Sequence, residues 1–365
     1  MIRKILLSLV SLVMFIITPI ISLYALVLKL IAKKDFYDFD GSKKRNVVMK
    51  HIVSKWWGIS DTAQKNRTFA LFVMPTLFAF SLFVIFTFLH GIYLSMTNWT
   101  GLNTGHETFI AFENYSGIFQ DYGFAFSLYR TALYSIISIF VINIVAFFLA
   151  MMVTQNLKLR NLYRAGFFLP NLIGGLVLGY IWQFIFNRAV PSLGGIFSTS
   201  LLINGNSALI GLVIVVTWQY AGYIMMIYIA ALQNVPQDLI EASKIDGANA
   251  WQRLKTVTMP LVAQAFTVSM FLTLVTSFKQ FDTISSLTQG GPAMLMPSWL
   301  GKLFGLGAFQ PAVQGNELIA INIYNEAFTN YSLGVGQAKA VIFFSFLVVI
   351  SLLQVYYNKR KEVEL

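Results

Sequence analysis

The stretch Glu241-Ala242-Ser243-Lys244-Ile245-Asp246-Gly247-Ala248 is a polar island between two long apolar segments, and it is closed by Met259-Pro260. The apolar runs on both sides are long enough to cross a bilayer. A membrane protein that keeps one short, charged, helix-forming loop between two spans is expected to present that loop to another molecule. The island is therefore a candidate docking site as well as a connection.

The composition places the chain among membrane proteins. Of its 365 residues, 57% are hydrophobic and only 11% are charged, whereas a soluble domain has roughly 25% charged residues. The net charge of +11 does not indicate a nucleic-acid partner, because the basic residues gather in a few loops beside apolar segments. The chain has no cysteine, which excludes disulfides, thiolate metal sites and cysteine nucleophiles.

Apolar segments of about 20 residues predict transmembrane helices. Seven such segments lie near residues 5–28, 69–92, 127–153, 165–186, 207–230, 260–281 and 337–357. The predicted fold is an all-α polytopic membrane protein. Its predicted parts are an N-terminal anchor helix (1–33), a basic cytoplasmic linker (34–68), a transmembrane domain (69–357) and a cytoplasmic tail (358–365).

Loop charge alternates along the chain. Four segments carry 10, 3, 3 and 3 basic residues, namely 29–67, 154–164, 231–259 and the tail from Asn358. The intervening loops carry none, Arg188 alone and Lys302 alone. Because loops rich in Lys and Arg stay in the cytoplasm, the basic segments and the C-terminus are predicted to be cytoplasmic. The odd number of spans then places the N-terminus outside.

The N-terminal region has alternative interpretations. Arg3-Lys4 before an apolar run is similar to a signal peptide, but the run continues to Leu30 and lacks a clear small-residue cleavage site. We therefore predict a retained anchor. The linker, with Trp56-Trp57 among its lysines, suits either an amphipathic segment on anionic lipid or a solvated connection.

The island predicts a short helix, a glycine turn and a second short helix. Pro236 suits a first helical turn because it lacks the N–H that would be unpaired there, and Asp238 lies in the same electropositive turn. Gly247 is expected to break the helix, which restarts over 248–258. Small residues would let the turn enter a groove on another protein, with Glu241 as a charged contact. A hairpin that merely connects two spans is the alternative.

The segment Pro236-Gln-Asp-Leu-Ile-Glu-Ala-Ser-Lys-Ile-Asp-Gly-Ala-Asn-Ala-Trp-Gln-Arg-Leu-Lys-Thr-Val-Thr-Met-Pro260 resembles the EAA loop of binding-protein-dependent ABC importer permeases, above all the maltose-type carbohydrate branch. Four further segments resemble other parts of that family, in the family's order. They are Ser95-Met-Thr-Asn-Trp99, Phe167-Phe-Leu-Pro170, Leu287-Thr-Gln-Gly-Gly-Pro292 and Ile323-Tyr-Asn-Glu-Ala-Phe328. With these segments in order, the resemblance covers roughly residues 69–357.

This resemblance implies a type I ABC importer transmembrane domain, with six core helices plus one N-terminal helix. Such a subunit pairs with a second homologous permease as a heterodimer and works with an extracytoplasmic solute-binding protein and a cytoplasmic ABC ATPase dimer. Residues 236–260 would be the coupling loop, and 282–336 an external loop. The residues implied to contact the ATPase are Glu241, Ala242, Ser243, Asp246, Gly247 and Ala248.

The implied subunit is a transporter component and not an enzyme. No Gly-x-x-x-x-Gly-Lys-Ser/Thr loop occurs in the chain, so ATP and Mg would be bound by the partner ATPase. No cofactor is expected in this chain. His51, His90 and His106 show no metal-ligand spacing, and neither a metal site nor a catalytic site is predicted.

Three departures from the family pattern affect what the resemblance implies. Ser243 stands where Ala is commonest, a change too small to prevent docking. Arg130 precedes Thr131 where Asn is expected, which would alter a contact on the external side. An insertion of about twenty residues around 293–318 would change either the contact with the binding protein or the substrate.

Polar and aromatic residues inside spans are candidates for a solute pathway, because they are costly in lipid unless they face a cavity or a neighbouring helix. Aromatic faces stack on sugar C–H surfaces, while amides and hydroxyls bind sugar hydroxyls. In the maltose-type branch the solute site uses the two spans that flank the coupling loop, so Tyr223 and Gln280 are the preferred pair. The full candidate set is Trp218, Gln219, Tyr220, Tyr223, Ser277, Lys279 and Gln280.

Each of these side chains has a structural alternative, such as anchoring at the interface, bonding a neighbouring helix or, for Lys279, pairing with Asp282. Other functions also remain as alternatives. A polyol or glycerol phosphate is a different solute for the same importer class. An ion-coupled secondary transporter would need buried acidic groups inside spans, and a membrane enzyme would need a catalytic or cofactor cluster.

Overall fold

The computed structural model describes residues 61–102, 105, 107–155, 158–307 and 310–359. The predicted anchor 1–33 and most of the linker 34–68 lie outside the described residues. The chain falls into two units, which meet between Val84 and Ile85, and each is described by itself. Among the described residues, four helices are long and apolar enough to cross a membrane, or up to six if each of two bent pairs is one span.

The first unit contains α3 (Asp61–Phe80) and most of the π-helix η1 (Ser81–Phe86). Large apolar side chains such as Phe78 and Phe83 are exposed along it. In the candidate span Phe72–Leu94, no residue of the most apolar stretch is buried. A helix that is apolar on all sides needs lipid or another subunit to cover it.

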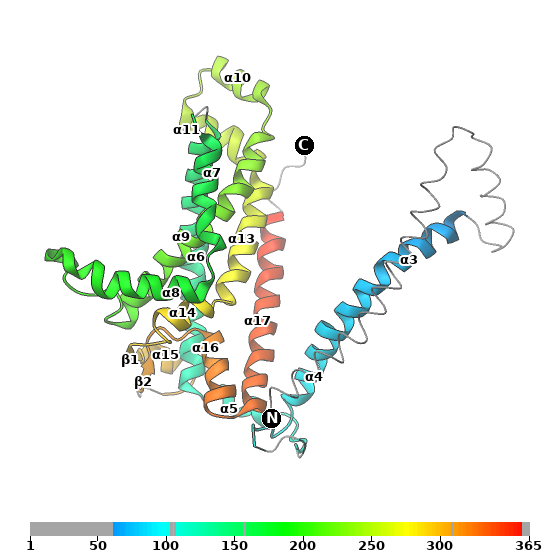
Figure 1. Cartoon of the computed structure of the whole chain (residues 1–365), viewed down its shortest axis with the longest axis vertical. Helices are drawn as coiled ribbons and strands as arrows, with labels where there is room; N and C mark the ends of the chain where they lie inside the picture. The colour runs from blue at the N-terminus through cyan, green and yellow to red at the C-terminus, as the bar shows by residue number, and fades with distance from the viewer. Residues whose placement is uncertain (1–60, 103–104, 106, 156–157, 308–309, 360–365) are drawn as a thin grey trace. The chain divides into compact units, whose positions relative to one another are not determined.

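The second unit is built around α6 (Tyr122–Thr154) and α9 (Gly205–Gln233), which pack along each other (Figure 1). α13 (Ala263–Phe278) packs against α6, and α17 (Leu333–Lys359) packs against α13. α4 (Thr87–Leu94) contacts α17. The core between α6 and α9 includes the buried side chains Tyr134, Ile142, Leu212, Met225 and Tyr228.

The segment predicted as a span at 165–186 is bent. The chain forms α7 (Arg160–Phe168) and a short 3-10 helix η2 (Leu169–Leu172), turns by 96°, and continues as α8 (Gly175–Phe184). Pro170 lacks an N–H for the helical ladder, and Ile173 adopts an extended backbone before α8 begins. Figure 1 shows α8 running across the direction of α7.

The span predicted at 260–281 is also bent. It begins with α11 (Ala250–Arg253), η6 (Leu254–Thr258) and α12 (Met259–Leu261), and a bend of 71° separates these from α13. Pro260 lies just before the bend, where it cannot donate to the helical ladder. The predicted spans near 69–92, 127–153, 207–230 and 337–357 correspond to helices.

The end of the second unit that carries α5 (Glu113–Ile118) is called the hairpin end, after the two-stranded β-hairpin described in the next paragraph. It also holds α14 (Asp282–Leu287), α16 (Ile319–Tyr324) and η7 (Asn325–Thr329). The chain between α8 and α9 contains η3 (Ile185–Ala189), η4 (Pro191–Leu193) and η5 (Gly195–Phe197).

The insertion around 293–318 forms a small lobe at the hairpin end. Strands β1 (Ala293–Leu295) and β2 (Ala312–Gln314) pair antiparallel, with Ala293 opposite Gln314, and α15 (Ser298–Leu303) lies between them in the chain. The all-α prediction therefore holds except for this one two-stranded sheet among the described residues. Buried Met296 and Leu300 pack against Phe126 of α6.

Candidate functional site

The polar island forms the opposite end of the second unit, referred to below as the loop end (Figure 1). Its helix α10 (Gln237–Ile245) begins directly after Pro236, with Asp238 in its first turn and Lys244 in its last. Negative charge near a helix N-terminus and positive charge near its C-terminus both stabilise the helix. The predicted order of helix, glycine turn and second helix is present.

A Schellman turn ends α10. The backbone N–H of Ala248 donates to the carbonyl of Ser243 at 3.0 Å, and that of Gly247 donates to Lys244 at 3.0 Å. Gly247 has φ +81°, a conformation that favours glycine. Asn249 and Gln252 then form a reciprocal capping box that starts α11. Local hydrogen bonds thus shape this turn without help from the rest of the fold.

The predicted coupling residues are accessible at the loop end. Glu241, Ala242, Asp246 and Gly247 are exposed, whereas Ser243 and Ala248 are half-buried. The Ser243 hydroxyl donates back to the carbonyl of Ile240 at 2.7 Å, so it is satisfied within its own helix.

Two large apolar side chains join this surface. Ile245 is 87% exposed and Trp251 is 69% exposed. Sequence reasoning did not assign Ile245, although an apolar residue in the last turn of an otherwise polar helix was a usable signal. The loop end therefore presents a charged and apolar surface around the glycine turn.

The candidate solute residues on α9 divide between two faces. Gln219 is buried and donates to the carbonyl of Ile173 at 3.1 Å, while Tyr220 and Tyr223 are half-buried and pack on the core. Trp218 is 45% exposed and lies edge-on to Trp182, with ring centroids 5.8 Å apart. Because neighbouring helical residues point about 100° apart, Trp218 is not brought together with the two tyrosines.

Trp218 belongs to an apolar groove between α6, α7 and α9, with a volume of about 720 Å³. Thr217, Ala221 and Gly222 line the same groove from α9. A side chain at Gly222 would overlap the backbone of Phe167, which shows how closely α9 approaches α7.

The candidates near the end of α13 also divide. Ser277 and Gln280 are buried, whereas Lys279 is exposed. In the described part of the chain, no ion pair joins Lys279 to Asp282, the partner considered for it. Two buried atoms, the Ser277 hydroxyl oxygen and the Gln219 carbonyl oxygen, have no hydrogen-bond partner among the described residues.

A buried polar cluster that sequence reasoning missed links three helices. The Tyr228 hydroxyl of α9 donates to the side-chain oxygen of Asn143 in α6 at 2.7 Å. It also lies 2.6 Å from the Ser269 hydroxyl of α13. The Asn143 amide also donates to the Thr273 hydroxyl at 3.2 Å. Asn143 inside an apolar run was the available sequence signal.

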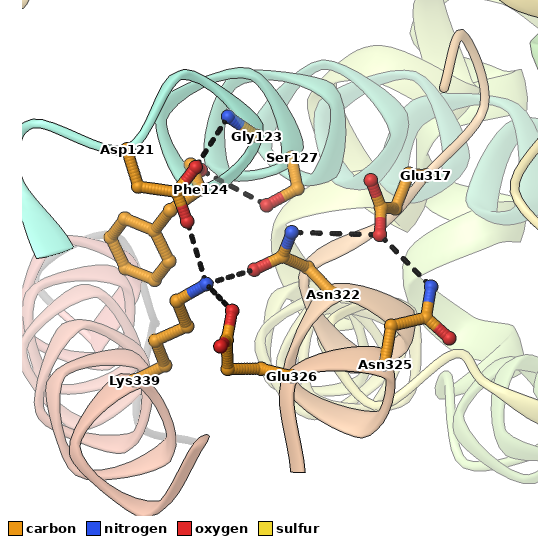
Figure 2. A network of polar contacts seen from close by, with 9 residues as sticks. All are labelled: Asp121, Gly123, Phe124, Ser127, Glu317, Asn322, Asn325, Glu326 and Lys339. Atoms are coloured by element: carbon orange, nitrogen blue, oxygen red, sulfur yellow. Dashed lines mark hydrogen bonds and ion pairs between the residues drawn. The ribbon is translucent and has the colours of Figure 1, made fainter. Parts of the chain in front are cut away.

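A second missed cluster lies at the hairpin end and centres on Lys339 of α17 (Figure 2). Its ammonium nitrogen lies 2.7 Å from a carboxylate oxygen of Asp121, the N-cap of α6, and 2.7 Å from one of Glu326 in η7. It also donates to the side-chain oxygen of Asn322 at 3.2 Å. The Lys339 side chain is only 1% exposed, so this pairing joins three elements around a buried charge.

Glu317 extends that cluster. It accepts from the Asn325 amide at 3.2 Å and from the Asn322 amide at 3.5 Å. Burial raises the pKa of the Glu317 carboxyl above its ordinary value, while these hydrogen bonds and the charge of Lys339 oppose that rise.

Arg130 ties α6 to the start of α9. Its guanidinium donates to the Asn206 side chain at 3.0 Å and to the carbonyl of Gly205, both at the start of α9. Nearby, the Tyr129 ring meets Trp299 of α15 edge-on, with centroids 5.2 Å apart. Arg130, which stands where Asn was expected, therefore makes its hydrogen bonds within this chain.

A family model described as the binding-protein-dependent transport system inner membrane component matches residues 142–363. The chain belongs to this family. The resemblance to importer permeases is therefore confirmed, and the chain is a multi-pass membrane protein.

The permease is 43% identical over 304 residues to the probable starch degradation products transport system permease protein AmyD of Thermoanaerobacterium thermosulfurigenes, covering 81% of this chain and 95% of that protein. It is 26% identical over 322 residues to the multiple sugar-binding transport system permease protein MsmF of Streptococcus mutans, covering 87% and 100%.

The permease also resembles, in fold, a solved bacterial ABC transporter involved in the import of the acidic polysaccharide alginate. The TM-score is 0.63 at 18% identity, covering 81% of this chain and 96% of that one. At this identity the likeness concerns the fold alone.

Proposed function

We propose that this permease imports a carbohydrate of the oligosaccharide or multiple-sugar type across the cytoplasmic membrane by ATP-driven alternating access. The exposed helix and glycine turn of α10 carry the proposal, because they provide a shaped docking element in a member of an importer family. The printed functions of AmyD and MsmF support a sugar as the solute.

The proposed complex contains a second homologous permease, a cytoplasmic ABC ATPase dimer and an extracytoplasmic solute-binding protein. ATP and Mg belong to the ATPase. The loop end, together with the C-terminus, faces the cytoplasm, in agreement with the basic residues of 231–259 and the tail. Glu241 makes a charged contact with the ATPase, and Ala242, Gly247 and Ala248 allow its close approach.

The proposed solute pathway runs past Tyr223 and Gln280. The unpartnered oxygen atoms of Ser277 and Gln219 support this assignment, because a buried polar atom without a partner is costly in a membrane. A hydroxylated solute supplies donors for such oxygens. The aromatic surface of Tyr220 and Tyr223 suits the C–H faces of a sugar.

Co-purification of the complete complex from its native membrane tests the coupling assignment. We expect the wild type to bring down an ATPase, a second permease and a solute-binding protein. Glu241→Lys and Gly247→Pro should lose the ATPase while keeping the second permease. The first reverses an exposed charge, and the second introduces a residue restricted to φ near −65° at a backbone φ of +81°.

Glu113→Lys is the matched control, because it makes the same charge reversal at an exposed residue of the hairpin end. It should retain the ATPase. Full retention of the ATPase by both loop variants would mean that α10 merely connects two helices.

A glycerol phosphate or polyol importer is the second candidate. Lys279 is exposed and has no ion pair among the described residues, which favours an anionic solute over a neutral one. Uptake assays with labelled glycerol 3-phosphate and labelled maltose in the same vesicles separate the two candidates. Transport of the phosphate ester alone would replace the carbohydrate assignment.

A further inference from the structure

A recess of about 490 Å³ at the hairpin end is separate from the groove that holds Trp218. Its walls come from the turn after α13, from α16 and η7, from the first turns of α17, and from the loop after α4. The volume lies within the range of about 300–1,000 Å³ that is typical of small-molecule sites. The lining residues that matter here are Trp99, Lys279, Phe281, Tyr324, Phe328 and Gln337.

Three of these residues form a row of aromatic rings. The ring centroids of Phe281 and Tyr324 are 5.2 Å apart, and those of Tyr324 and Phe328 are 5.0 Å apart. Tyr324 is 46% exposed and Phe328 is 61% exposed. The row therefore offers ring surface to an incoming molecule without a change of side-chain packing.

Three residues that carry hydrogen-bond donors, Trp99, Lys279 and Gln337, also line the recess. The buried Trp99 indole N–H has no partner among the described residues. Rings combined with donors suit a glycosyl unit, which has flat C–H faces and a rim of hydroxyl acceptors.

The Lys339 cluster holds two walls of the recess in place. Lys339 lies two positions after Gln337 in α17, and Glu326 lies between Tyr324 and Phe328 in the chain. Their ion pair at 2.7 Å joins α17 to η7, two of the elements that line the recess. Glu326 does not line the recess, and among the described residues Lys279 is the one charged residue that does.

The recess adjoins the proposed solute pathway. Lys279 and Phe281 line the recess, while Gln280, which lies between them in the chain, is buried, with 6% exposure. A chain of sugar units that reaches Gln280 thus has the aromatic row beside it.

We propose that this recess is a second saccharide subsite, which binds an additional glycosyl unit of an oligosaccharide that also occupies the pathway at Tyr223 and Gln280. The inference rests on the proposed carbohydrate function. It assigns Tyr324 and Phe328 a role in selecting longer sugars.

The test uses the complete importer in proteoliposomes, with labelled maltose and labelled maltotetraose as probes. Tyr324→Ala and Phe328→Ala should raise the KM for maltotetraose by about two- to tenfold, the effect of losing one aromatic contact. The KM for maltose should stay near the wild-type value. Tyr324→Phe, which keeps the ring, should behave as wild type.

Tyr357→Ala is the matched control, because Tyr357 lies at the far end of α17 and has the same 61% exposure as Phe328. It should leave both KM values unchanged. Equal losses for both sugars, or no loss for either, overturn the subsite while leaving carbohydrate import intact. If the wild type transports neither sugar but does transport glycerol 3-phosphate, the proposed function and the subsite fall together.

Discussion

Lys339 shows how one residue can organise the hairpin end. A buried ammonium is costly unless carboxylates and hydrogen-bond acceptors surround it, and Asp121, Glu326 and Asn322 supply these. The phenyl ring of Phe124 adds a cation–π contact, with the nitrogen 5.9 Å from its centroid. This single charge fixes the start of α17 relative to α6 and η7.

Replacement of Lys339 by Met should destabilise the protein strongly. The substitution leaves two carboxylates without their cation, and breaking such a buried pair costs about 3 kcal/mol or more. Thermal unfolding of the detergent-purified permease should show a clearly lower midpoint. Lys302→Met, which removes an exposed lysine of α15, should leave the midpoint near that of the wild type. Equal midpoints for both variants would contradict a structural role of the cluster.

The residue-level prediction from sequence was partial. The lysine inside the last apolar segment was a visible signal, but its partner Asp121 lies 218 positions away. Asn143 and Tyr228 are likewise 85 positions apart. A pattern along the chain does not pair such residues, because their proximity depends on how the helices pack.

At the scale of elements, close helix contacts depend on glycine. A Cβ at Gly222 would overlap the carbonyl of Phe167, so α9 and α7 approach without a side chain between them. Gly175 provides a similar contact, because a Cβ there would lie 2.8 Å from the Asp282 Cβ of α14. These contacts position the bent α7–α8 pair against the bundle.

Gly222→Ala should lower the free energy of unfolding by about 1–3 kcal/mol, because the methyl group forces the two backbones apart. Gly166→Ala in α7 is the control, since a Cβ there meets nothing within 4 Å. It should be neutral or stabilise by up to about 1 kcal/mol. Unfolding midpoints of the two purified variants decide the matter. A tolerated Gly222→Ala would show that α9 and α7 separate easily.

At the scale of the whole molecule, the loop end and the hairpin end carry separate tasks within the second unit. Ile245→Ala should lower the maximal uptake rate by trimming the surface proposed to meet the ATPase, whereas Phe328→Ala should raise the KM for maltotetraose. In the double variant the free-energy effects of the two substitutions should add to within about 0.5 kcal/mol, because the two sites share no partner among the described residues. Uptake kinetics of the four proteins measure this. A strong departure from additivity would indicate that the two ends influence each other.

The membrane class, the approximate positions of the core helices and the helix–turn–helix of 236–260 could be predicted from the sequence. These features depend on composition and on local spacing, and the Gly247 turn is closed by hydrogen bonds between near neighbours. The same local information identified the importer family.

The 96° break between α7 and α8, the exposure of Trp218 and the aromatic recess became visible only in the folded protein. An apolar run in the sequence indicates that a segment is nonpolar, but it does not indicate where or in which direction that segment bends. The recess and the Lys339 cluster join residues from distant parts of the chain. Their geometry follows from helix packing, which no local pattern encodes.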